Sequence, residues 1–171
     1  MEVIQWCKSQ LICLLILAYV GIDYIKEGKQ LNRLTKKSNC NTIYDMLFIV
    51  TEIAVVFDAI TAFTVNYLQQ IPRGINLFFH ACMFVSYEIY VVLLFWYWVS
   101  VTIGIPKKKW IKAVTIVPLI AIIGLTLVLL PDISFIEGKY TNYSMGAAVY
   151  VCFGSVIFYC ILSLAIVFLP V

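Results

Sequence analysis

Residues 75–105 read INLFFHACMFVSYEIYVVLLFWYWVSVTIGI, and this stretch decides the class of fold. It contains no Lys, Arg or Asp, and its only acidic and imidazole side chains are Glu88 and His80. A helix rises about 1.5 Å per residue, so roughly 20 apolar residues cross the hydrocarbon core of a bilayer. The stretch is therefore predicted to be a transmembrane helix.

The rest of the chain repeats this pattern on both sides of the stretch. Of the 171 residues, 63% are hydrophobic and only 12% are charged, whereas soluble domains are about 25% charged. This composition excludes a soluble globular domain and a disordered chain. The net charge of +3 is too small to indicate nucleic acid as a partner. We therefore predict an all-α polytopic membrane protein, with the lipid bilayer as its partner and residues 1–171 as one bundle of five transmembrane helices, at about 6–25, 41–67, 75–105, 110–130 and 143–169.

The basic residues in the loops predict the orientation of the bundle. The four loops carry five, one, four and one Lys or Arg residues in chain order. Cytoplasmic loops are enriched in Lys and Arg. The loops that hold Lys36 and Lys108 are therefore expected inside, and those that hold Arg73 and Lys139 outside. This arrangement places the N-terminus outside and the C-terminus in the cytoplasm.

Polar side chains inside the predicted spans are the candidate site. Ionisable residues are costly in a membrane and usually face the interior of a bundle. From the rise per residue, two carboxyl groups fall near the middle of the membrane, and an aspartate and the histidine fall in its outer half. We expect this set to form a ligand or proton site. Its members are Glu52, Asp58, Thr61, His80 and Glu88.

The spacing along residues 41–67 divides these side chains between two faces. Thr61 lies on the same stripe as Asp58, and the stripe continues through Ala62 and Val65. Glu52 points roughly 120° away from Asp58. One interpretation is a polar pocket or a proton-titratable cluster inside the bundle. The other is structural, because buried carboxyl groups also form hydrogen bonds that hold helices together.

No catalytic motif occurs in the sequence. The metalloprotease pattern H-E-x-x-H, the hydrolase pattern G-x-S-x-G, the P-loop and the dinucleotide pattern G-x-G-x-x-G are all missing. The six cysteines form no C-x-x-C pair, and there is a single histidine, so no metal site is predicted. We expect a chain that is not an enzyme and that needs no cofactor.

Three short runs resemble a known family. They are CNTIYD at 40–45, FDAITAFT at 57–64 and YTNYSMG at 140–146. This order resembles the N-terminal multi-helix membrane region of bacterial signalling proteins of the Gram-positive type, in which a cytoplasmic GGDEF domain, sometimes with an EAL domain, follows the membrane region. The characteristic positions of this family region match Asp45, Asp58, Thr61 and Gly146 of this chain.

The resemblance implies a sensory input module in the bacterial cytoplasmic membrane. Its partner is a cytoplasmic output domain, such as a diguanylate cyclase, in the same chain or a partner chain, and a homodimer is compatible with this role. The family region has about seven helices, so we expect the chain to be the N-terminal part of a longer protein. One alternative is a small proton- or cation-coupled transporter or channel subunit. Another is a passive membrane anchor.

Overall fold

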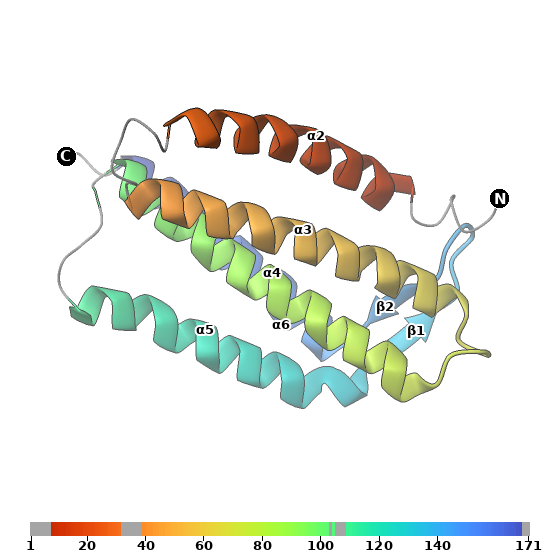
Figure 1. Ribbon diagram of the computed structural model, residues 1–171. Coiled ribbons are helices and arrows are strands. Elements are labelled where there is room, and N and C mark those ends of the chain that lie inside the picture. The colour runs from red at the N-terminus through yellow and green to blue at the C-terminus, as the bar shows by residue number, and fades with distance from the viewer. Residues whose placement is uncertain (1–7, 32–38, 103, 105–108, 169–171) are drawn as a thin grey trace.

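The computed structural model describes residues 8–31, 39–102, 104 and 109–168. Five long helices run side by side in alternating directions in this part of the chain (Figure 1). They are α2 (Lys8–Leu31), α3 (Asn39–Asn66), α4 (Arg73–Thr102), α5 (Lys109–Leu129) and α6 (Ala147–Phe168). A short β-hairpin between α5 and α6 lies at the same end as the start of α2 and the α3–α4 connection (Figure 1). We call this the hairpin end and the other the distal end.

Within the described residues, four helices are long and apolar enough to cross a membrane, which is typical of a multi-pass membrane protein. The corresponding segments are Thr42–Asn66, Arg73–Thr102, Thr115–Asp132 and Ala147–Ala165. The first helix has a shorter apolar part, Lys8–Ile22. A mostly helical fold with four membrane-length helices is thus confirmed, while the fifth span and the orientation stay predictions. Much of the basic loop sequence behind the orientation lies outside the described residues, including Arg33, Lys36, Lys37, Lys107 and Lys108.

Proline residues set two of the helix boundaries. The Pro72 carbonyl accepts hydrogen bonds from the backbone N–H groups of Ile75 (3.0 Å) and Asn76 (3.3 Å), and α4 begins directly after this proline. Pro131 lies in η1, a 3₁₀ helix over Leu130–Asp132, and α5 ends just before it. Proline cannot supply the backbone donor that an α-helix interior needs.

The predicted start of the last helix, at residue 143, is wrong. Strand β2 (Tyr143–Met145) pairs antiparallel with β1 (Ser134–Ile136), in a register that sets Phe135 opposite Ser144. Gly146 follows with φ +146°, a conformation that favours glycine. A Cβ atom there would lie 3.0 Å from the backbone oxygen of Asp132. The chain therefore turns at Gly146 and becomes helical only at the next residue.

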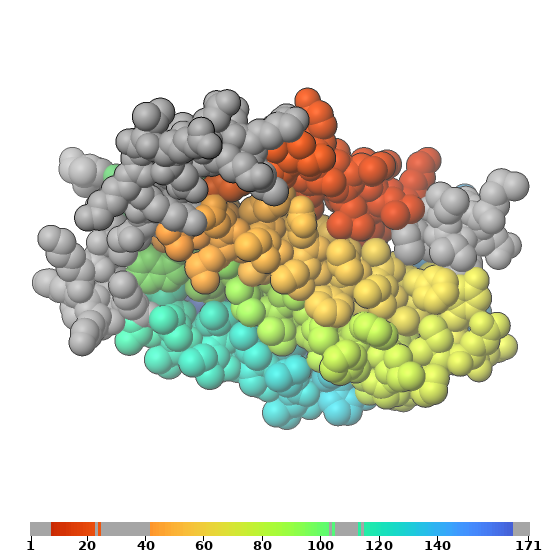
Figure 2. All heavy atoms as spheres, viewed as in Figure 1, coloured from red at the N-terminus to blue at the C-terminus, as the bar shows by residue number. Residues whose placement is uncertain are grey.

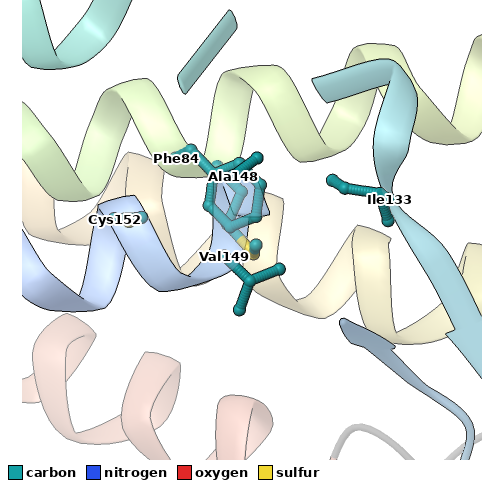
Figure 3. Close-up of a cluster of buried hydrophobic side chains, with 6 residues drawn as sticks. Phe84, Ile133, Ala148, Val149 and Cys152 are labelled. Carbon is teal, nitrogen blue, oxygen red and sulfur yellow. The ribbon is translucent and has the colours of Figure 1, made fainter. Parts of the chain in front are cut away.

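Helix α4 lies at the centre of the bundle and contacts α3, α5 and α6. Figure 3 shows an apolar cluster where α4 and α6 meet, with Ile133 approaching it from the segment before β1. We call this the hairpin-end core; its buried members are Met83, Phe84, Ile133, Ala148, Val149 and Cys152. A second cluster, the distal core, is built on Val91, Val92 and Tyr159.

Helix α2 lies along α3, on the edge of the bundle away from α5 (Figure 2). The two helices approach closely at Gly21, which is buried. A Cβ atom at this position would lie 2.7 Å from Cζ of Phe48 and 3.7 Å from Oε1 of Glu52. Small residues allow such close contact between membrane helices.

Candidate functional site

A cavity of about 470 Å³ lies at the hairpin end, between α2, α3, α4, α6 and the hairpin. Small-molecule sites typically enclose about 300–1,000 Å³. Exposed residues such as Ser9 and Thr141 border it, so it reaches the surface. The lining consists of Ser9, Gln10, Asp58, Thr61, Ala62, Val65, His80, Met83, Phe84, Tyr87, Thr141, Asn142, Tyr143, Ser144, Val149, Cys152 and Phe153.

Two helical stripes supply the facing walls of the cavity. On α3 the lining residues are 58, 61, 62 and 65, and on α4 they are 80, 83, 84 and 87. Residues three and four apart share one face of a helix. The stripe that the sequence predicts from Asp58 to Val65 thus borders a single cavity, and a matching stripe that begins at His80 faces it.

The carboxylate of Asp58 joins three helices. The side-chain amide of Gln10, in the first turn of α2, donates a hydrogen bond of 3.0 Å to its Oδ2. The Tyr87 hydroxyl on α4 is a second hydrogen-bond partner. Asp58 itself is only half-buried. This carboxylate is therefore held in place by its neighbours while it still borders open space.

The imidazole of His80 is 1% exposed, and its contacts show which ring nitrogen carries the hydrogen. Its Nδ1 lies 2.9 Å from the backbone oxygen of Asn76. A carbonyl oxygen only accepts, so Nδ1 carries the hydrogen, and Nε2 of the neutral ring is an acceptor. The ring lies close enough to Asp58 for the two groups to interact electrostatically.

The hairpin loop borders the cavity and is tied to the end of α3. Asn66 donates from Nδ2 to the Thr141 hydroxyl (2.9 Å) and accepts at Oδ1 from the backbone N–H of Asn142 (2.9 Å). The Asn142 side chain donates in turn to the backbone oxygen of Val65 (3.1 Å). These bonds fix the position of the loop at the mouth of the cavity.

Glu88 lies outside the cavity, in a sealed environment. It is 0% exposed. The Ser155 hydroxyl donates to its Oε2 (2.5 Å), whereas Oε1 has no hydrogen-bond partner. The Cys152 thiol also faces this carboxyl group without satisfying Oε1. Buried polar atoms are nearly always paired, so this one is an exception.

Glu52 also lies outside the cavity. It is half-buried beside Gly21, on the face of α3 that packs against α2. Nearer the distal end, the Tyr24 hydroxyl donates a hydrogen bond to Asp45. The structure thus brings Asp58, Thr61 and His80 together at one cavity and leaves Glu52 and Glu88 at two separate places.

Several cavity residues are missing from the sequence-based set. Gln10 is a polar residue at the start of an apolar stretch, and its position was the available signal. Tyr87 lies seven residues after His80, which places both on one helix face. The loop residues Thr141 and Asn142 carry no such signal, because their position depends on a tertiary contact with α3.

Among the residues that the structure describes, no group of three or more His, Cys, Asp or Glu side chains could hold a metal ion. Comparison of the chain with family models, with curated proteins and with solved structures found no match.

Proposed function

We propose that the chain is the membrane-embedded input module of a signalling receptor, which binds a small solute at the hairpin end and passes a helix movement to the distal end. The observation that carries this proposal is the cavity at Asp58, which α2 borders through Gln10. The distribution of basic residues supports placing the hairpin end outside the cell.

Helix α2 is the element best placed to transmit a change. It packs mainly along α3, whereas α4 has three long helices around it. A polar contact links α2 to α3 on either side of Gly21, Gln10 with Asp58 and Tyr24 with Asp45. Elements with few packed neighbours need the least free energy to move. A solute that competes for Asp58 therefore acts directly on the first turn of α2.

The receiving partner under this proposal is a cytoplasmic output domain, in the same chain or in a partner chain, as the resemblance to membrane regions of GGDEF proteins implies. A diguanylate cyclase is the output that fits it. The bacterial cytoplasmic membrane is the matching location. A membrane module of this kind performs no chemistry itself and changes only the balance between two arrangements of its helices.

A proton- or cation-coupled transporter is the second candidate, and Glu88 favours it. Buried carboxyl groups in membrane helices often mark proton pathways. Against transport, the distal core around Val91, Val92 and Tyr159 packs between α4 and α6 beyond the cavity. A solute that left the cavity toward the distal end would have to cross this packed layer.

Hydrogen exchange of the purified full chain in lipid nanodiscs tests the input-module proposal. Gln10→Ala removes the bond to Asp58, so amide exchange should rise along α2 by about fivefold, the value of one typical hydrogen bond, including residues near Tyr24. Ile12→Ala is the matched control, because Ile12 is 49% exposed on the same helix. A rise confined to the first turn of α2 would overturn coupling along the helix.

Flux measurements separate the two candidates. In proteoliposomes with an imposed pH gradient, a transporter dissipates the gradient, whereas an input module leaves it at the rate of empty vesicles. Dissipation that Glu88→Gln abolishes would establish transport instead. Glu52→Gln, which removes the same charge from a different face, is the control.

A further inference from the structure

The Asp58 carboxylate and the His80 ring contribute free acceptor positions to the cavity. The Asp58 carboxylate offers about four acceptor positions, and Gln10 and Tyr87 supply two donors to it. His80 adds Nε2 as an acceptor, because its Nδ1 is held by the backbone oxygen of Asn76. The Thr61 hydroxyl donates back to the backbone oxygen of Asp58 (2.9 Å). A ligand group that lies between Asp58 and His80 must therefore donate hydrogen bonds.

The charge of the cavity points the same way. Its lining, within the described part of the chain, includes Asp58 but no Lys or Arg. Three described cationic side chains lie at this end. Lys8 is exposed at the start of α2 and is not part of the lining. Arg73 donates to the backbone oxygens of Pro131 (2.7 Å) and Ile133 (3.2 Å), and Lys139 lies 5.3 Å from the ring centre of Tyr140. A positively charged ligand is therefore complementary to the cavity, and an anionic ligand is not.

Aromatic rings complete the lining. Phe84, Tyr87 and Phe153 border the cavity together with Met83. Aromatic faces attract cations within about 6 Å of the ring centre and also accept apolar groups. The size of the cavity suits a molecule with one charged end and a compact apolar body.

From these three observations we propose that the cavity binds a small protonated primary amine that carries an apolar group. Its ammonium lies between the Asp58 carboxylate and Nε2 of His80, and its apolar body lies against the aromatic rings. The ammonium competes with Gln10 for the carboxylate. This assignment rests on the proposed function only in its choice of the cavity, and it adds the chemical class of the ligand.

Binding of three probes of one size and different charge tests the proposal. The full chain in lipid nanodiscs is titrated by calorimetry with phenethylamine, 2-phenylethanol and phenylacetate. Phenethylamine should bind saturably, the alcohol at least about tenfold more weakly, and the carboxylate without measurable heat, because a charge-assisted hydrogen bond contributes a factor of ten or more. Equal affinity for the amine and the alcohol, or no saturable amine binding, would overturn the proposal.

Two matched variants locate the site. Asp58→Asn should weaken phenethylamine binding at least about tenfold, and Glu52→Gln, which removes the same charge six residues away and outside the cavity, should leave it unchanged. The wild-type probe series keeps the test decisive even where Asp58→Asn fails to fold. Preference for the alcohol or carboxylate refutes the ligand class alone, whereas amine binding without any change in α2 exchange refutes the input module alone.

Discussion

Asp58 and Glu88 are both carboxyl side chains on apolar helices, yet their surroundings differ. Asp58 is half-buried, borders a cavity and has partners on α2 and α4. Glu88 is fully buried between α4 and α6 and has one oxygen without a partner. Of these two carboxyl groups, only Asp58 combines open space with free acceptor positions, so only Asp58 is placed to contact a solute. Burial alone does not distinguish recognition from packing.

The difference between Asp58 and Glu88 matters for sensing only if the cavity at Asp58 opens to the outside of the cell. We expect all-or-none labelling of intact cells by an impermeant maleimide: Lys139→Cys, in the hairpin loop, should react, and Lys108→Cys should not. Gly138 is a poor position for the label, because a Cβ atom there would lie 2.2 Å from the Thr141 oxygen. The unmodified chain with its six cysteines is the blank.

The reverse labelling pattern would place the cavity on the cytoplasmic side. In that case a solute from outside could not reach Asp58, and an outward-facing receptor would be excluded.

The next largest expected effect is the change in unfolding free energy when Glu88 or Asp58 is replaced by alanine. Glu88→Ala should lower the free energy of unfolding by about 2–4 kcal/mol, because it opens a sealed void beside Ser155. Asp58→Ala should cost only about 1 kcal/mol, since water in the cavity can replace the lost group. Thermal or denaturant unfolding in detergent measures both values.

Glu88→Gln is the control for shape. It keeps the volume and an acceptor for the Ser155 hydroxyl, so most of the stability should return. A Gln variant as unstable as the Ala variant would mean that the acid itself, and not packing, holds α4 and α6 together.

Releasing the hairpin loop from α3 should have a smaller effect on the free energy of unfolding. Asn66→Ala removes the bonds to Thr141 and Asn142 and should cost about 1–2 kcal/mol of unfolding free energy. Proteolysis in the hairpin loop should become faster. Tyr140→Ala, in the same loop but 71% exposed, serves as the control. Equal proteolysis of both variants would show that Asn66 does not fix the loop.

The smallest effect is expected at Thr61. Its hydroxyl donates within its own helix to the backbone oxygen of Asp58 and contacts Met83 Sδ (3.2 Å). Thr61→Val should therefore change phenethylamine affinity by less than about threefold and unfolding by less than about 1 kcal/mol. A tenfold loss of affinity would place this hydroxyl among the groups that contact the ligand.

Periodicity along single helices explains what could be predicted. The stripe from Asp58 to Val65 is visible in the sequence, because helical spacing alone sets which residues share a face. Membrane-length helices follow from apolar runs in the same way. Depth in the membrane is a weaker guide to which residues meet. The rise per residue places Glu52 and Glu88 at one level, but they lie beside different helices, α2 and α6.

Contacts between distant segments explain what could not be predicted. Gln10 meets Asp58 across 48 residues, and Asn66 meets Asn142 across 76. No local pattern encodes either pair. The hairpin strands have three residues each, which is too short for an alternating pattern to stand out. Tyr143 also continues into an apolar run that resembles helix.

The close approach at Gly21 is the point about which any tilt of α2 against α3 would turn, and it divides the helix into two arms. From the rise of a helix, the arm toward Gln10 is about 16 Å long and the arm toward Leu31 about 15 Å. With arms of nearly equal length, a tilt about Phe48 moves both ends by the same distance in opposite directions. A tilt that moves the Gln10 end of α2 away from α3 would thus bring the Leu31 end toward α3 by about the same distance.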